Sequence, residues 1–147
     1  MAGVGGREFF IDDFEDPDEV SRVVEIACKD VLTRTGGAGF PVLCGINHDD
    51  TISWVKEGVE RAVANALVYH SSLRERGRCT EREVEEWLRR RRCGDEERIL
   101  IVEVDASRGW EASHCLVVDG GGFSFENLVM RTVGYCTVVR EAPDASQ

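Results

Sequence analysis

The clearest structural signal in this chain is the stretch from 98 to 111, RILIVEVDASRGWE. Residues 99–104 form a nearly continuous, β-branched apolar run, which predicts a buried parallel strand. An acid and a polar glycine loop follow, then a second apolar run at 115–118, a glycine-rich turn and the segment ENLVMR at 126–131. Strand, loop, strand and arginine-bearing helix in this order are typical of α/β sheets that bind nucleotides at their strand ends.

The rest of the chain alternates short apolar runs with helical patterns. Asp16, Pro17 and Glu19 supply the first helix with an N-cap, a proline at its first position and a capping-box acid. Asp49 or Asp50 caps the second helix. The alternation predicts a three-layer α/β sandwich with a mostly parallel sheet, in one domain over 1–141 with a disordered tail at 142–147. Expected strands are 8–11, 40–44, 99–104, 115–118 and 135–139, and expected helices are 17–32, 50–69, 81–93 and 124–131.

Length and composition fit one globular domain. The 147 residues are 42% hydrophobic and 31% charged, and no apolar run approaches the ~18 residues of a membrane span. Residues 1–7 lack the basic and apolar regions of a secretory signal. A formal net charge of −10 argues against a free-standing nucleic-acid binder, because basic contacts to phosphates supply most non-specific affinity. We expect a cytoplasmic or otherwise intracellular protein with no membrane partner.

The charge is unevenly distributed along the chain. Residues 1–60 carry 13 acids against 5 bases, whereas residues 74–98 carry nine arginines against eight acids. Four of these arginines are consecutive, at 89–92. One interpretation is that they close a helix, where cations complement the macrodipole and the last carbonyls. The other is a patch that contacts phosphate or docks a partner.

Cysteines occur at 28, 44, 79, 93, 115 and 136. Cys44, Cys115 and Cys136 lie in apolar runs, so we interpret them as small core residues in a reducing cell. No two cysteines form C-x-x-C, and the side chains of His114 and Cys115 are expected on opposite faces of a strand. The sequence therefore predicts no metal site. His48 lies four residues after Cys44, but a cysteine inside an apolar strand is usually inert as a nucleophile.

Several aspartates fall where strands are expected to end or helices to begin. In parallel sheets this edge carries the chemistry, so a cluster of carboxylates is one interpretation. Helix capping is the interpretation that we favour for several of them. The residues concerned are Asp12, Asp13, Asp49, Asp50, Asp105 and Asp119.

Two segments of the last third resemble helicase motifs. Residues 104–118 (VDASRGWEASHCLVV) are similar to the fifth motif of superfamily-one helicases, in which a small polar residue and a basic-glycine-x-glutamate sequence separate two apolar strands. Residues 126–139 (ENLVMRTVGYCTVV) are similar to the sixth, in which a helix ends in an arginine before a terminal strand. The resemblance implies a RecA-like fold, as in the phosphate-loop NTPases, corresponding to the second motor domain of these helicases.

The resemblance also implies roles for particular residues. Arg131 corresponds to the arginine finger that reaches the γ-phosphate from the second motor domain and stabilises developing charge. Ser107, Arg108, Gly109 and Glu111 correspond to the loop that couples nucleotide to nucleic acid. Alternatively, Gly109 is a turn, Glu111 is an exposed acid and Arg131 neutralises a helix end.

The sequence departs from the helicase pattern at the phosphate loop. No G-x-x-x-x-G-K-[ST] occurs, and residues 3–6 (GVGG) have neither the lysine nor the hydroxyl that hold phosphates and magnesium. Met130, Val133 and Gly134 surround Arg131 where the family usually has hydroxyl or basic residues. We therefore expect a degenerate domain that needs no cofactor on its own, and that uses ATP and Mg²⁺ only if another domain completes the site.

Two functions fit these observations. The first is a non-catalytic, helicase-like domain that serves a larger protein as a regulatory or protein-interaction module, with a protein or an adjacent domain as its partner. The second is the half-site of an ATP-dependent helicase or NTPase, which supplies Arg131 to a separate phosphate-loop domain. A self-contained α/β binding domain with a coincidental likeness to helicases is a third interpretation, which a strand order unlike that of a RecA-like sheet would support.

Overall fold

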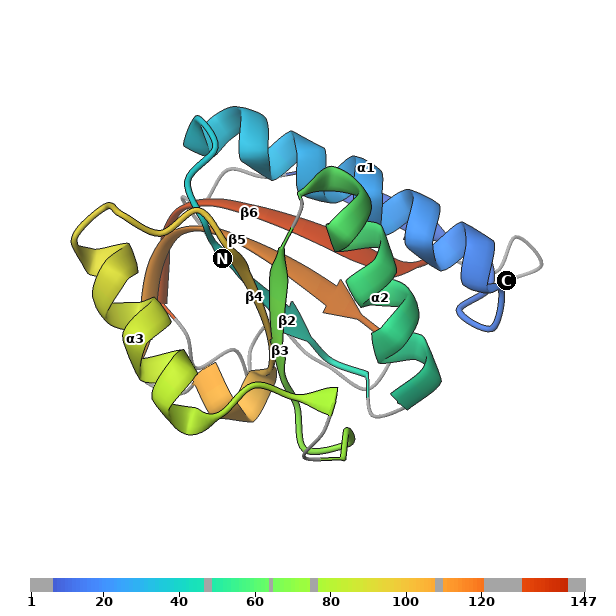
Figure 1. Ribbon diagram of the computed structural model, residues 1–147. Helices are drawn as coiled ribbons and strands as arrows, with labels where there is room; N and C mark the ends of the chain where they lie inside the picture. Colours follow the sequence, from blue (N-terminus) through green and yellow to red (C-terminus); the bar gives the residue numbers. More distant parts are fainter. Residues whose placement is uncertain are drawn as a thin grey trace.

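Six parallel strands form a single sheet in the order β1-β6-β5-β2-β4-β3 (Figure 1). The computed structural model describes residues 7–46, 49–63, 65–74, 77–107, 110–120 and 131–142, with the backbone alone at 49, 111 and 131–134. Its strands are β1 (Glu8–Ile11), β2 (Pro41–Cys44), β3 (Ala66–Tyr69), β4 (Ile99–Glu103), β5 (Glu111–Asp119) and β6 (Arg131–Glu141). The helices are α1 (Pro17–Thr35), α2 (Asp49–Ala62), α3 (Glu81–Arg92) and the short 3₁₀ turn η2 (Val104–Ser107).

Helices cover both faces of the sheet, which confirms the predicted three-layer α/β architecture. α1 and α2 lie side by side and pack against one face, where a core cluster contains Val24 of α1 and Val42 of β2 (Figure 1). α3 packs against the opposite face, where Trp87 meets Leu43 in a second cluster. Val42 and Leu43 are adjacent in β2 but belong to different clusters, because successive side chains of a strand point to opposite faces. Both faces of the central strands are therefore buried, as their continuous apolar sequences predict.

The ends of α1 follow from its sequence. The Asp16 carboxylate accepts hydrogen bonds from the backbone N–H groups of Asp18 and Glu19, and Pro17 occupies the first turn, as predicted. The carboxylate of Glu19 accepts instead from the N–H of Asp13 at 2.8 Å, so it fixes the turn after β1 rather than completing a capping box with Asp16. Gly36 ends the helix with a φ of +66°, a conformation that favours glycine.

α3 is held at its start and along its buried face. Thr80 and Glu83 form a reciprocal capping box that satisfies the first N–H groups of the helix. The indole N–H of Trp87 donates to the carbonyl oxygen of Arg98 at 2.8 Å, just before β4 begins. Because Trp87 is fully buried, this bond and the packing of its ring fix α3 against the sheet.

The prediction of a helix from 50 to 69 is wrong in its second half. α2 ends at Ala62, and Ala66–Tyr69 forms β3, which pairs in parallel with Ile99–Val102 of β4. The helical spacing of α2 continues through Ala62, Val63, Ala66 and Leu67. A four-residue apolar run such as Ala66–Tyr69 fits a strand equally well, however. Pairing with β4 decides between the two conformations, and sequence periodicity does not encode that pairing.

The last predicted helix also needs a correction. Arg131 was expected to end a helix over 124–131, but it is the first residue of β6. Residues 124–130 lie outside the described part of the chain. β5 and β6 begin four residues earlier than their apolar runs indicate, because their first residues pair with each other from Glu111 and Arg131 onward.

Within the described ranges, no helix combines the length and the apolar character needed to cross a bilayer.

Candidate functional site

The carboxyl edge of the sheet is the first place to look for a site, because ligands of parallel α/β folds bind where neighbouring crossovers diverge. Here the chain leaves β2 toward β3 on one side, whereas it leaves β5 toward β6 on the other. Gly45 and Gly120 follow these two strands, and the N–H of Gly45 donates to the carbonyl of Val118 at 2.8 Å. A Cβ atom at Gly120 would approach Cγ1 of Ile46 to 2.6 Å. The described residues that follow β2 and β5 therefore come into close contact at this point.

The polar groups beside this point hold the loop after β3. Glu103, the last residue of β4, accepts hydrogen bonds from the N–H and the hydroxyl of Ser71, at 3.2 and 2.7 Å. Nδ1 of the fully buried His70 accepts from the N–H of Ser72 at 3.1 Å. Burial lowers the pKa of His70, despite the opposing charge of Glu103, so the imidazole is neutral near pH 7. This arrangement fixes the loop after β3.

The predicted coupling loop is only partly described. Ser107 lies at the end of η2 and is fully buried, and its hydroxyl donates to the carbonyl of Val104 at 2.7 Å. Arg108 and Gly109 lie outside the described residues. Ser107 therefore closes a 3₁₀ turn, and its role in coupling stays a prediction.

Glu111 and Arg131 meet across two neighbouring strands. Glu111 opens β5, Arg131 opens β6, and the two residues are direct register partners. The backbone thus brings together the segments that resemble the fifth and sixth helicase motifs. The side chains of Glu111 and Arg131 are not described, so their predicted roles stay predictions.

The strand-end aspartates do not form a metal site in the described part of the chain. Asp12 and Asp119 follow β1 and end β5, which are separated by β6. Asp13 accepts a hydrogen bond from the N–H of Glu15 at 2.8 Å, as expected for a turn-forming aspartate. Among the described residues, no group of three or more His, Cys, Asp or Glu side chains could hold a metal ion.

The cysteines behave as the sequence predicts. Cys44, Cys115 and Cys136 are buried, and all six cysteines are free thiols. Burial raises the pKa of Cys44 to about 12, which suppresses the reactive thiolate. His48, its suggested partner, lies outside the described residues. Cys115 points into the second core cluster, whereas His114 lines a pocket beside α1, so they occupy opposite faces of β5 as expected.

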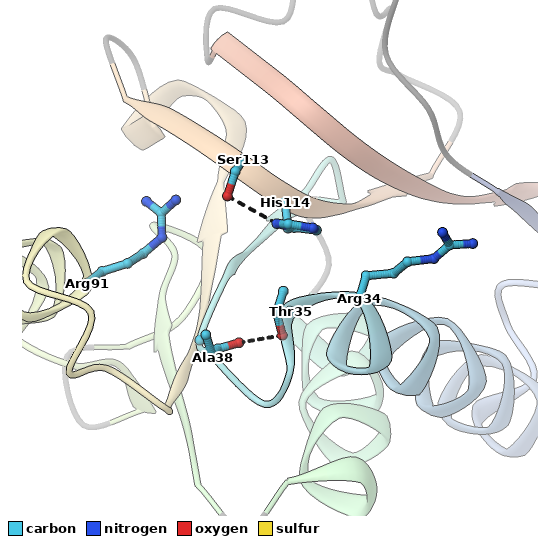
Figure 2. A pocket seen from close by; sticks show the side chains of 7 residues that line it. Arg34, Thr35, Ala38, Arg91, Ser113 and His114 are labelled. Carbon is cyan, nitrogen blue, oxygen red and sulfur yellow. Dashed lines mark hydrogen bonds between the residues drawn. The ribbon is translucent and has the colours of Figure 1, made fainter.

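A pocket lies at the opposite, amino edge of the sheet. It has a volume of about 240 Å³ and is formed by the end of α1 and the loop after it, the last turn of α3 and the start of β5 (Figure 2). The hydroxyl of Ser113 lies 3.0 Å from Nδ1 of His114, and the hydroxyl of Thr35 donates to the carbonyl of Ala38 at 3.0 Å. We call it the amino-edge pocket; its lining residues are Arg34, Thr35, Ala38, Gly39, Arg91, Ser113 and His114.

Aromatic rings hold both arginines of the amino-edge pocket. The guanidinium of Arg34 lies 4.4 Å from the ring centre of Tyr135, and that of Arg91 lies 5.6 Å from the ring centre of Trp87. Partial burial lowers the pKa of His114, and the charges of Arg91 and Arg34 lower it further. The imidazole is therefore neutral near pH 7, although it lies among hydrogen-bonding groups.

The arginine run at 89–92 lies in the last turn of α3, where cations favour the helix dipole. Arg90 donates to the carbonyl of Asp95 at 3.1 Å and forms an ion pair with the buried Glu96 at 3.8 Å. The helix-closing interpretation thus accounts for Arg90, whereas Arg91 reaches the amino-edge pocket. The sequence alone does not predict this pocket, because no pattern links Arg34, Arg91 and His114 along the chain.

Comparisons with known proteins support the fold. No family model matches the chain, and no curated protein is significantly similar to it in sequence. Among solved structures, the chain is similar to S. cerevisiae Dbp5 bound to RNA and ADP BeF₃, with a TM-score of 0.57 and 12% sequence identity. The alignment covers 97% of this chain and 37% of the Dbp5 chain. The chain therefore shares its α/β fold with a part of the Dbp5 structure.

Proposed function

We propose that this chain is a non-catalytic, helicase-like domain that serves a larger protein as a regulatory or protein-interaction module. The extent of the likeness to Dbp5 carries the proposal, because 97% of this chain matches only 37% of that one. A match of this extent fits one domain within a longer protein. The missing G-x-x-x-x-G-K-[ST] sequence supports a domain that has no catalysis of its own.

The charge and the sheet edge favour a protein as the partner. A net charge of −10 repels nucleic acid, so an adjacent domain or another protein fits better. β1 is an edge strand of the described sheet, and it carries Phe10, which is 45% exposed. An exposed apolar side chain on an edge strand is a suitable place for a partner to add. The free thiols fit a reducing, cytoplasmic or otherwise intracellular compartment.

ATP hydrolysis tests the non-catalytic part of this proposal. The 147-residue chain is incubated with ATP and Mg²⁺, with and without single-stranded RNA, and phosphate release is followed. We expect release equal to a protein-free blank in both cases. The control is Arg22→Ala, a matched change on the exposed side of α1. The domain would be catalytic if phosphate release exceeded the blank and was lost in Arg131→Ala but kept in Arg22→Ala.

The half-site is the second candidate, and the pairing of Glu111 with Arg131 favours it. This pairing places both motif-like segments at one point of the sheet, as a shared function requires. In a full-length protein with a phosphate-loop domain, Arg131→Ala should then abolish ATP hydrolysis while the far-UV circular dichroism and melting temperature stay unchanged. Retention of activity in that variant would exclude the arginine-finger role.

A further inference from the structure

The two outer strands of the described sheet, β1 and β3, differ in what covers them. Beside β3, the N–H of Cys79 donates to the carbonyl of Val68 at 2.8 Å, so the segment between β3 and α3 covers part of that edge. In the part of the chain that the structure describes, β1 pairs only with β6. The outer side of β1 is therefore the edge at which the sheet can be extended.

The main chain of β1 presents hydrogen-bonding groups on this outer side. The carbonyls of Arg7 and Ile11 accept hydrogen bonds from N–H groups of β6 and of the residue after it, at 2.8 Å each. Because main-chain groups that point to the same side of a strand recur at every second residue, Phe9 also faces β6. The N–H and C=O groups of Glu8 and Phe10 therefore point away from β6, as the addition of a further strand requires.

The side chains of β1 divide between a buried and an exposed face. Ile11 is fully buried in the first core cluster, and Phe9 packs against the same cluster. Glu8 and Phe10 lie on the other face, where Phe10 is 45% exposed and the carboxylate of Glu8 lies 3.7 Å from the guanidinium of Arg140. A strand added to β1 would therefore gain an apolar contact with the ring of Phe10.

Acidic residues surround the carboxyl end of β1. Residues 12–19, which follow this strand directly, include six acids and no base, and five of these acids are exposed. Three of the six also form the turn and the helix cap through bonds to backbone N–H groups. Glu141, which ends the neighbouring strand β6, is exposed as well. A segment that adds to β1 thus meets an anionic surface at one end of the strand.

This charge decides between the possible occupants of the edge. A second copy of the chain would bring the same six acids and a net charge of −10, so repulsion opposes the pairing of β1 with itself. Nucleic acid is opposed for the same reason. A polypeptide segment that combines apolar residues with lysine or arginine complements both the Phe10 ring and the acids.

We propose that the outer edge of β1 binds an extended, basic segment of a partner protein. The inference rests on the proposed function as a protein-interaction module, and it names where the partner adds and which chemistry it carries. The segment pairs its main chain with the outward groups of Glu8 and Phe10 and places an apolar side chain beside the Phe10 ring. Its lysine or arginine side chains lie against the acids of residues 12–19.

The test is a titration of the isotope-labelled 147-residue chain with the synthetic peptide KVKVTVKVK, followed by two-dimensional NMR and amide hydrogen exchange. We expect saturable shifts at β1 and slower exchange of the outward N–H groups of Glu8 and Phe10, because strand addition protects them. Two control peptides separate the contributions. EVEVTVEVE reverses the charge, and KVKPTPKVK keeps the charge but disrupts main-chain pairing, so each should bind about tenfold more weakly or worse.

Two pairs of variants locate the binding surface. Phe10→Ala should weaken binding of KVKVTVKVK about tenfold, whereas Ile26→Ala, on the solvent side of α1 and 46% exposed, should leave it unchanged. Asp12→Asn should weaken binding about threefold, whereas Asp95→Asn, at an exposed acid after α3, should not. All four residues are exposed, so we expect each variant to keep the parent far-UV circular dichroism and melting temperature.

Several results would overturn the proposal. They are a lack of saturable binding, binding of either control peptide as tight as that of KVKVTVKVK, unchanged amide exchange at Glu8 and Phe10, and equal effects of Phe10→Ala and Ile26→Ala. A dimer of the free chain in sedimentation velocity that Phe10→Ala dissociates would show that a second copy occupies the edge. None of these results bears on ATP hydrolysis. Phosphate release by the chain would in turn contradict the non-catalytic function and leave strand addition at β1 standing.

Discussion

Replacement of Trp87 tests how α3 is attached to the sheet. Trp87 is fully buried, its indole N–H donates to the carbonyl of Arg98 at 2.8 Å, and its ring centre lies 6.4 Å from that of Trp110. Trp87→Phe keeps an aromatic ring but removes the donor and leaves a small void. We expect this variant to fold with the same topology and lower stability.

The expected loss is the sum of two effects. A buried carbonyl that loses its partner costs about 1–3 kcal/mol, and the two ring carbons that phenylalanine lacks cost about 0.8 kcal/mol each. Together they give about 2.5–4.5 kcal/mol, a large part of the ~5–15 kcal/mol that stabilises a typical domain. For a chain of this size, the melting temperature should fall by about 5–15 °C.

The assay is urea unfolding followed by far-UV circular dichroism, because the substitution itself changes tryptophan fluorescence. Trp54→Phe is the matched control, since Trp54 lies half-buried on α2, where it packs at the margin of the first cluster. We expect the control to lose less than about 1 kcal/mol. Equal losses in Trp87→Phe and Trp54→Phe would refute the view that Trp87 anchors α3 through the Arg98 bond.

Two further substitutions test other contacts of the same region. Burial alone would raise the pKa of Glu96, but the hydrogen bonds and charge of Arg98, with the charge of Arg90, outweigh it and hold that pKa below its ordinary value. In the unfolded chain, a glutamate has a pKa of about 4.3. Because the pKa of Glu96 is lower than this in the folded chain, its ionised form adds to the free energy of unfolding above about pH 4.3, and this contribution is lost as the pH falls through the folded-state pKa. Glu96→Gln should therefore reduce the free energy of unfolding at pH 7. It should also make that free energy fall less steeply below about pH 5, as measured by urea unfolding at a series of pH values. The control Glu97→Gln, at an exposed position, should have the same free energy of unfolding as the parent chain. Gly39→Ala should destabilise the chain by more than Gly36→Ala. A Cβ at Gly39 would overlap the Arg98 carbonyl oxygen, whereas a Cβ at Gly36 meets nothing within 4 Å and costs only the strain of its positive φ, about 1–2 kcal/mol. Similar melting temperatures of the two variants would contradict this prediction.

Local sequence signals predicted most of the fold because the elements concerned are specified locally. Continuous apolar runs marked β2 and β4, and caps and proline marked the start of α1. β3 was missed because a four-residue apolar run fits either a strand or a helix, and only its pairing with β4 selects the strand. Arg131 was placed at a helix end because the polar first residues of β6 hide a strand that β5 stabilises by pairing.

The candidate pocket was beyond prediction for a different reason. Arg34, Arg91 and His114 come from three elements that only the topology brings together. The run at 89–92 was a real signal, but four identical residues cannot show which of them reaches the pocket. His114 was noticed for its neighbour Cys115, although the two point to opposite faces of β5.

The central claim is that this helicase-like domain has no nucleotide site of its own, and calorimetric titration with a non-hydrolysable ATP analogue and Mg²⁺ tests it most directly. The parent chain and Arg131→Ala are titrated side by side after both are shown to be folded, with Arg34→Gln included to separate any phosphate contact in the amino-edge pocket. We expect no binding that depends on both Mg²⁺ and Arg131. Micromolar binding that requires Mg²⁺ would contradict the central claim if Arg131→Ala weakened it and Arg34→Gln did not.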